Sequence, residues 1–228
     1  MLRKTFDKLR FLSHFFSSAK RRGLVHTLRI SLYELWFERK FGNATGTVIP
    51  VERLDYDGEA RVHAEAYFPS SYLFLNEALA TGPVDCSGRT LVDFGCGMGR
   101  VLLFASTLPF KRLIGVEVSP ALCDRAKNNL DRYYRAKNKF LPDWKIVNAD
   151  ARAFRPPDDA SVFYIFNAFD ATILDTVLEN ILISLREVPR KCYFVYANPV
   201  HEALLVDKGF AKVLQSAKDY VIYTNAPR

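Results

Sequence analysis

Three glycines at alternate positions, Gly95, Gly97 and Gly99, constrain the fold of this chain more than any other feature. They follow the apolar residues 91–94, which include Asp93, and they precede a helical pattern. Glycine has no Cβ, so it adopts positive φ angles and lets a ligand approach the main chain, and the start of a helix offers unpaired N–H groups to an anionic group. The segment therefore predicts a strand, a tight turn and a helix that together cradle a small molecule.

The rest of the chain alternates short apolar runs with helical patterns. We expect strands at residues 91–94, 112–117, 144–147, 162–166, 192–196, 211–214 and 220–223. Helices are expected at residues 72–79, 101–105, 119–137, 173–185 and 201–208. Such alternation predicts an α/β fold with a doubly wound, mostly parallel seven-stranded sheet, to which the short last connection adds an antiparallel edge strand. Ligands of such sheets bind beyond the carboxyl ends of the strands, where the glycines lie.

The N-terminal part differs from the rest in charge. Residues 1–42 hold ten Lys and Arg against three acidic residues, whereas the remainder of the chain is balanced. Helical spacing of apolar residues recurs at residues 2–19 and in a second segment that we expect to end at Gly42. The apolar residues of this second helix are Leu24, Val25, Leu28, Leu32, Leu35 and Trp36. These faces favour packing on the domain or on a second subunit over contact with a membrane surface or acidic lipid.

The composition excludes several classes of function. The four cysteines form no C-x-x-C pair and the four histidines are scattered, so we expect neither a zinc site nor a disulfide framework. No uncharged run approaches the ~18 apolar residues of a membrane span, and no long apolar segment marks a secretion signal. We expect a cytoplasmic protein, although residues 1–33, basic and serine-containing, also suit a mitochondrial presequence. Basic charge confined to the N-terminus gives no strong case for a nucleic-acid partner.

Polar residues follow the predicted strands in order. Glu117 closes the second strand, where a carboxylate accepts both hydroxyls of a ribose, and Asp150 and Asn167 follow the third and fourth strands. Each alone is more often a helix cap or a surface residue, but together they favour a nucleoside site. The glycines do not fit the dinucleotide fingerprint, whose third glycine would fall at Arg100, so an NAD-dependent oxidoreductase is the weaker alternative.

With these residues, the sequence resembles the class I S-adenosylmethionine-dependent methyltransferases over about residues 65–225. The resemblance implies S-adenosyl-L-methionine as cofactor and a Rossmann-like methyltransferase domain at residues 65–228, preceded by a helical extension and covering loop at residues 1–64. It further implies that the glycine segment lies against the methionine part, that Glu117 binds the ribose and that Asp150 meets the adenine amine. The cofactor-binding residues that we expect are Tyr67, Asp93, Phe94, Gly95, Cys96, Gly97, Glu117, Val118, Asp150, Ala151 and Asn167.

The residues after the fourth strand bear on the methyl acceptor. Methyltransferases that act on amides and bases carry Asn or Asp followed by two prolines and an aromatic residue, whereas this chain has Asn167-Ala168-Phe169. That departure argues against methylation of a base within DNA. The stretch, together with residues 67–71, is similar to protein lysine methyltransferases that lack a SET domain. This similarity implies that Asn167 is the catalytic residue, which accepts a hydrogen bond from the amine, while Phe169 covers the sulfonium.

Several alternatives stay open at this point. The first function is a methyltransferase whose acceptor is an amine nitrogen of a protein side chain or of a small molecule. The second is a non-catalytic nucleoside-binding or scaffold domain that docks on a membrane or partner through its basic N-terminal helices. Asp170 is either a general base or, as we favour, the N-cap of the following helix.

Residues 41–67 and Asn198-Pro199 also resemble an uncharacterised group of small bacterial methyltransferases.

Overall fold

A computed structural model describes residues 23–42, 45–50, 54–55, 67–137, 141–216 and 219–225. Its centre is one seven-stranded sheet with the strand order β3-β2-β1-β4-β5-β7-β6. The strands are β1 Thr90–Phe94, β2 Arg112–Glu117, β3 Asp143–Asn148, β4 Ala160–Phe166, β5 Tyr193–Ala197, β6 Ala211–Ser216 and β7 Tyr220–Thr224. Strands β1 to β5 pair in parallel, and β7 runs antiparallel to both β5 and β6. The doubly wound, mostly parallel sheet expected from the sequence is confirmed.

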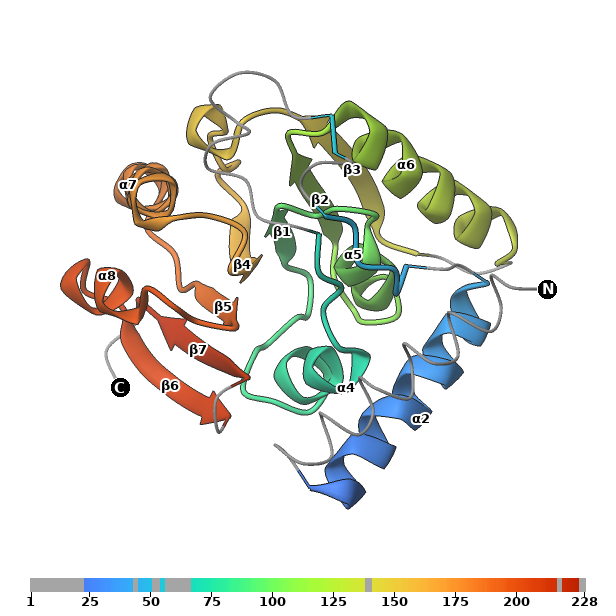
Figure 1. The fold of residues 1–228 in the computed structure, drawn as a ribbon. Helices are drawn as coiled ribbons and strands as arrows, with labels where there is room; N and C mark the ends of the chain where they lie inside the picture. The colour runs from blue at the N-terminus through green and yellow to red at the C-terminus, as the bar shows by residue number, and fades with distance from the viewer. Residues whose placement is uncertain are drawn as a thin grey trace.

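Helices cover both faces of this sheet (Figure 1). The helical segments are α2 Leu24–Phe41, α4 Tyr72–Leu75, the π-helical turn η2 Asn76–Ala80, α5 Arg100–Ala105, α6 Pro120–Arg135, the 3-10 turn η3 Ala151–Ala153, α7 Ala171–Glu187 and α8 Glu202–Asp207. Helices α2, α4, α5 and α6 contribute to one core cluster, and α7 and α8 contribute to the other. The helix expected at residues 2–19 lies outside the described residues, and the division of the chain after residue 64 stays a prediction.

Alternation along the strands builds the two cores. Successive side chains of a strand point to opposite faces, so Leu91 joins the cluster of α5 and α6 while Val92 and Phe94 join that of α7. Both faces of the central strands are therefore apolar, as parallel sheets require. The chain runs from β1 outward to β3 and then returns to β4, which lies on the other side of β1. This reversal of strand order places a binding crevice at the carboxyl ends of β1 and β4.

Helix termini follow their local sequence signals in most cases. Ser119 accepts a hydrogen bond from the Leu122 amide at 3.1 Å and Pro120 starts α6, and Gly42 ends α2 in the left-handed region with φ of 63°. The cap of α4 differs from this pattern. Its N-cap residue Ser71 makes no capping bond, and the first amide of α4 instead donates to Glu34 Oε1 of α2 at 2.8 Å. A carboxylate from a distant helix thus replaces the local cap.

Helix α2 packs on the domain through the face opposite to the one that the apolar pattern indicated. Phe37 and Phe41 are buried, and the Phe37 ring stacks on Tyr72 with centroids 4.9 Å apart. The six residues that we expected to form its packing face, Leu24, Val25, Leu28, Leu32, Leu35 and Trp36, are 45–74% exposed. Both faces of α2 are apolar, so helical period alone does not decide between them.

Candidate functional site

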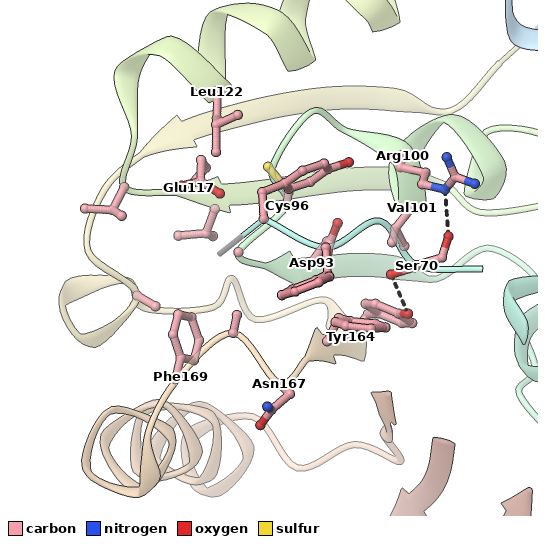
Figure 2. A pocket seen from close by; sticks show the side chains of 18 of the residues that line it. Ser70, Asp93, Cys96, Arg100, Val101, Glu117, Leu122, Tyr164, Asn167 and Phe169 are labelled. Atoms are coloured by element: carbon pink, nitrogen blue, oxygen red, sulfur yellow. Dashed lines mark hydrogen bonds between the residues drawn. The ribbon is translucent and has the colours of Figure 1, made fainter. Parts of the chain in front are cut away.

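A pocket of about 240 Å³ opens at the carboxyl ends of the central strands. It is lined by residues that follow β1, β2, β3 and β4, and by the segment that precedes α4. Figure 2 shows Asp93 and Glu117 on neighbouring strands, with Asn167 and Phe169 across the pocket from Glu117. The crevice that the strand order predicts is therefore the place where the polar strand-end residues meet.

The glycine turn after β1 needs glycine at two positions for steric reasons. The Gly95 and Cys96 amides both donate to the Val116 carbonyl, at 2.8 and 3.0 Å, so the chain reverses tightly against β2. Gly97 has a φ of 53°, and a Cβ there would lie 2.2 Å from the ring of Tyr67. A Cβ on Gly95, whose φ is 73°, would lie 2.8 Å from Ala168. The turn thus depends on backbone conformations and close approaches that a larger side chain disturbs.

Glu117 is buried at the end of β2, and both of its carboxylate oxygens are hydrogen-bonded to the main chain. Oε2 accepts from the Gly97 amide at 2.9 Å, and Oε1 accepts from the Ser119 amide at 3.0 Å. Burial raises the pKa of Glu117, and hydrogen bonds from the Ser119, Gly97 and Val118 amides act in the opposite direction. A carboxylate accepts about four hydrogen bonds, and the amides of Gly97, Val118 and Ser119 donate to this one, so Glu117 can still accept from a ligand hydroxyl.

Asp93 is 2% exposed and lies on β1 beside Glu117. Its Oδ2 atom is buried and has no hydrogen-bond partner within the residues that the structure describes. Burial, together with the charge of Glu117, raises the pKa of Asp93 well above its usual range. A buried carboxylate oxygen without a partner is costly, so this position fits a ligand that brings a cationic hydrogen-bond donor.

The two other acids singled out in the sequence serve as caps. Asp150 lines the pocket, but its Oδ1 accepts from the Arg152 amide at 2.8 Å and its Oδ2 pairs with the Arg152 guanidinium at 2.7 Å. Asp170 accepts from the Ile173 amide at 3.0 Å and begins α7. The cap role that we favoured for Asp170 is thus present, and Asp150 combines a cap with a place in the pocket wall.

The far end of the pocket is formed by the ends of β4 and β5. Asn167 and Asn198 follow these strands with positive φ angles of 33° and 48°, and both line the pocket. Asparagine tolerates this region better than most residues with a side chain. Tyr164 of β4, three residues before Asn167, is buried and donates its hydroxyl to Ser70 Oγ at 2.9 Å. This end presents amide groups and aromatic rings, with Phe68 and Phe166 in its wall.

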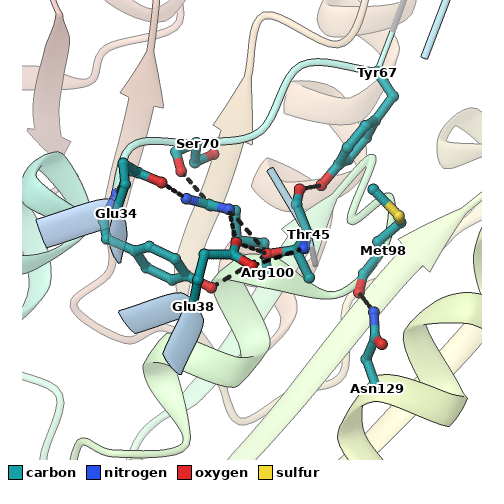
Figure 3. Close-up of polar contacts among 9 residues, drawn as sticks. Glu34, Glu38, Thr45, Tyr67, Ser70, Met98, Arg100 and Asn129 are labelled. Carbon is teal, nitrogen blue, oxygen red and sulfur yellow. Dashed lines mark hydrogen bonds and ion pairs between the residues drawn. The ribbon is translucent and has the colours of Figure 1, made fainter. Parts of the chain in front are cut away.

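Arg100 anchors the glycine turn to the N-terminal helix (Figure 3). Its side chain is 3% exposed, and it pairs with Glu34 and, at 2.8 Å, with Glu38 of α2. The guanidinium also donates to the Ser70 carbonyl at 2.6 Å and lies 3.7 Å above the Tyr72 ring. Burial lowers the pKa of Arg100, but two adjacent carboxylates keep an intrinsically strong base charged.

Nine of the predicted cofactor-binding residues line the pocket: Tyr67, Asp93, Gly95, Cys96, Glu117, Val118, Asp150, Ala151 and Asn167. Phe94 points instead into the core beside Phe163, where the ring centroids are 6.5 Å apart, and Gly97 contributes its amide to Glu117. From the sequence we did not place Ser70, Arg100 or Tyr164 in the site, although all three line the pocket. Tyr164 lies within an apolar run, and Arg100 stands out only because it replaces the third glycine of the dinucleotide fingerprint. The sequence around neither residue therefore indicates a place in the pocket.

Residues 91–190 match a family model described as a methyltransferase domain. These residues form a methyltransferase domain. Ribosomal protein L11 methyltransferase of Tolumonas auensis is 39% identical over 49 residues, or 22% of this chain and 17% of that protein. The enzyme of the same name from Alteromonas mediterranea is 41% identical over a segment of the same length, again 22% and 17% of the two chains. This chain therefore spans only about a sixth of the curated relatives that it matches.

The methyltransferase domain also resembles solved structures in fold. The pyocyanin biosynthetic protein PhzM has 16% identity and a TM-score of 0.51, with 67% of this chain and 54% of that chain covered. Magnesium protoporphyrin IX methyltransferase of Synechocystis PCC 6803, solved with bound S-adenosylmethionine, has 13% identity and a TM-score of 0.47, with 67% and 75% covered. The methyltransferase domain and the fold predicted from the sequence are confirmed, whereas the individual site residues stay predictions.

The described part of the chain adds two negative findings. It contains no group of three or more His, Cys, Asp or Glu side chains arranged to hold a metal ion. Within the same residues, no helix combines the length and the apolar character that crossing a bilayer requires. The cytoplasmic location expected from the sequence stays a prediction.

Proposed function

We propose that the protein transfers a methyl group from S-adenosyl-L-methionine to an amine nitrogen of a protein side chain or of a small molecule. The observation that carries the proposal is the unpaired, buried Oδ2 of Asp93 beside Glu117 at the glycine turn. Together they offer a site for a cationic amine on one side and for two ribose hydroxyls on the other. The cofactor supplies an electrophilic methyl group on a sulfonium.

The chain's own residues hold and orient that cofactor in this proposal. Asp93 accepts hydrogen bonds from the ammonium of the methionine part, and Glu117 accepts from the ribose hydroxyls with the acceptor capacity that its main-chain donors leave. Asp150 and Ala151 line the part of the pocket where the base would lie. The Tyr67 ring lies over Gly97, and its hydroxyl donates to the Thr45 carbonyl at 3.0 Å, so Tyr67 is held above the turn.

The acceptor end favours an amine because of its lining. Asn167 presents an amide oxygen there, and Tyr196 already donates its hydroxyl to that oxygen at 3.5 Å, which limits how the side chain rotates. Phe166 and Phe169 add aromatic surface, which suits the positive charge that moves from sulfonium to nitrogen. Positioning two reactants in this way supplies roughly 7–11 kcal/mol of a barrier without covalent chemistry from the protein.

The names of the relatives support a protein side chain as one acceptor class. Two of them are methyltransferases of ribosomal protein L11, although the similarity is confined to 49 residues. That segment is too short to carry a substrate from one protein to another. We therefore propose the chemical class, an amine nitrogen, and leave protein and small-molecule amines as the two outcomes to be separated.

Calorimetric titration of the full chain with S-adenosylhomocysteine tests the cofactor site. Wild type should bind, and Glu117→Gln should bind at least tenfold more weakly, since it loses one charged acceptor and hydrogen bonds to charged groups are worth about 1.5–3 kcal/mol. Glu187→Gln is the matched control, because Glu187 is exposed at the end of α7 and pairs with Arg155 far from the pocket. Folded protein that shows no binding would favour the scaffold alternative.

The chemical stability of the methylated product identifies the class of acceptor. Methyl-labelled S-adenosylmethionine is incubated with the full chain and either a protein extract or a small-molecule extract. An N-methyl product keeps its label in alkali, whereas a carboxyl methyl ester loses it. Alkali-labile label would overturn the amine assignment while leaving the methyltransferase assignment intact.

A further inference from the structure

Helix α2 carries two apolar faces, and only one of them packs on the domain. Phe37 and Phe41 are buried on the inner side, with Ile30 and Tyr33 packed against the same cluster. The outer face consists of six residues that are 45–74% exposed: Leu24, Val25, Leu28, Leu32, Leu35 and Trp36. At 3.6 residues per turn these six positions fall within about a third of the helix circumference, so they form one stripe.

A contiguous stripe of this kind marks an interaction surface. Single exposed apolar side chains are ordinary, but large exposed apolar patches mark sites for protein or membrane contact. Leu32, Leu35 and Trp36 also line a groove of about 680 Å³ whose other wall includes Phe104 and Leu108. The apolar area of the outer face therefore continues from α2 into the adjoining surface of the domain.

The acidic residues of α2 are withdrawn from the outer face. The helix contains two acids, Glu34 and Glu38, and both are bound to the buried Arg100 on its inner side. At the edge of the outer face, Arg29 lies 3.9 Å from Glu77, which belongs to the neighbouring turn η2. Because both acids of α2 pair with Arg100 inside the domain, the exposed side of the helix carries no acidic residue of its own.

The remaining charge along the outer face is positive. Arg39 and Lys40 lie in the last turn of α2, and Lys40 Nζ lies 4.8 Å from the centre of the Trp36 ring. Three further basic residues, Lys20-Arg21-Arg22, precede Gly23 and the helix in the sequence. A tryptophan beside lysine and arginine, on a helix with an apolar stripe, is typical of segments that lie at a bilayer surface.

We infer that the outer face of α2 docks on a membrane surface that contains anionic lipid. The helix lies in the plane of the interface, with its six apolar side chains among the acyl chains and its basic residues at the headgroups. Anionic headgroups complement Arg39 and Lys40, which an uncharged surface would not. The groove beside Trp36 gives the acyl chains additional apolar surface.

Charge disfavours the two other occupants of the outer face. A second copy that paired through this face across a two-fold axis would bring the basic residues of one α2 beside those of the other. The chain's own residues 1–22 contain seven basic residues and one acid, so they too would add positive charge to a positive surface. An anionic bilayer is the occupant that satisfies both the apolar stripe and its basic border.

Vesicle sedimentation with the full chain tests this inference. The protein should sediment with mixed phosphatidylglycerol and phosphatidylcholine vesicles, less with phosphatidylcholine alone, and less in high salt. Leu32→Ser/Trp36→Ser should weaken binding to the anionic vesicles at least tenfold, because two large apolar groups no longer enter the bilayer. Thermal unfolding checks that this variant is folded, which is expected since both side chains are more than half exposed.

The control removes exposed apolar side chains elsewhere on the surface. Val206 on α8 is 54% exposed and Val213 on β6 is 38% exposed, so Val206→Ser/Val213→Ser should bind vesicles as wild type does. Equal binding of the Leu32/Trp36 variant, equal binding to neutral vesicles, or no sedimentation of folded wild type would each overturn the inference. A dimer in light scattering that the Leu32/Trp36 variant abolishes would assign the outer face to a second copy instead.

Discussion

At the scale of single residues, Asp93 decides how the pocket responds to pH. Its pKa in the free protein is raised by burial and by the charge of Glu117, so part of the population is protonated at pH values where an exposed aspartate is ionised. A cationic amine binds the ionised form. Ligand binding must therefore release a proton when the pH lies below the raised pKa, and that requirement weakens binding there.

We predict that the affinity for S-adenosylhomocysteine rises with pH through the raised pKa of Asp93 and levels off above it. Methylthioadenosine lacks the amino acid part, so its affinity should not show the pH dependence that comes from Asp93. It should retain any pH dependence that comes from Glu117. Asp93→Asn should bind S-adenosylhomocysteine more weakly and remove the difference in slope between the two ligands. Calorimetry across the pH range measures both slopes, and identical slopes in wild type would contradict the assigned role of Asp93.

Single residues also show where sequence reasoning succeeds. Asp93 and Glu117 were predictable because an acid before a glycine turn, or at the end of the next strand, occupies a position fixed by local structure. Arg100 was not predictable, since its partners Glu34 and Glu38 lie 66 and 62 residues earlier in the chain. A local sequence pattern does not predict an ion pair between residues so far apart in the chain.

At the scale of elements, Arg100 joins the first turn of α5 to α2. Replacing it leaves Glu34 and Glu38 without a counter-charge, and their side chains are only 30% and 25% exposed. Breaking a buried ion pair by removal of one partner costs about 3–5 kcal/mol, and partial access of water to the two carboxylates places this case near the lower end. The clamp therefore stabilises the domain and fixes α2 beside the glycine turn.

Arg100→Met should lower the free energy of unfolding by about 3 kcal/mol, measured by urea denaturation. Arg186→Met is the control, because Arg186 is exposed on α7, and it should change stability by less than about 0.5 kcal/mol. Adding Glu34→Gln and Glu38→Gln to Arg100→Met should recover part of the loss, since no uncompensated charge is left. A loss below about 1 kcal/mol in the single variant would show that the pairs contribute little.

Helix α2 also shows why element existence is easier to predict than orientation. Its helical period and Gly42 correctly indicated a helix that ends at Phe41. The period could not indicate which face packs inward, because Ile30, Tyr33 and Phe37 form a second apolar stripe. Glu34 and Glu38 lie on that inner side, so the position of Arg100 is what selects it.

At the scale of the whole molecule, the alternating pattern of strands and helices predicts the strand order except for the position of β7. Strands β1 to β5 and their crossovers were predictable, because right-handed βαβ connections leave few topologies. The short connection after β6 indicated an antiparallel pair, but it did not show that β7 enters between β5 and β6. That placement buries all five residues of β7, whereas β6 at the margin contains none that is fully buried.

The stability of the whole molecule should depend on which nucleoside is present. Binding to the folded state alone stabilises it by about 2.7 kcal/mol at a ligand concentration 100 times the dissociation constant. For a chain of this size that corresponds to a rise in melting temperature of roughly 5–10 °C. S-adenosylhomocysteine should produce this shift, whereas NAD at the same concentration should produce none, because the guanidinium-bearing Arg100 stands where a dinucleotide site has its third glycine. Thermal denaturation with each ligand makes the comparison, and Glu117→Gln should reduce the shift to about half or less, since a tenfold weaker affinity leaves about 1.4 kcal/mol of stabilisation. An equal shift with NAD would contradict the assignment of the pocket to S-adenosylmethionine.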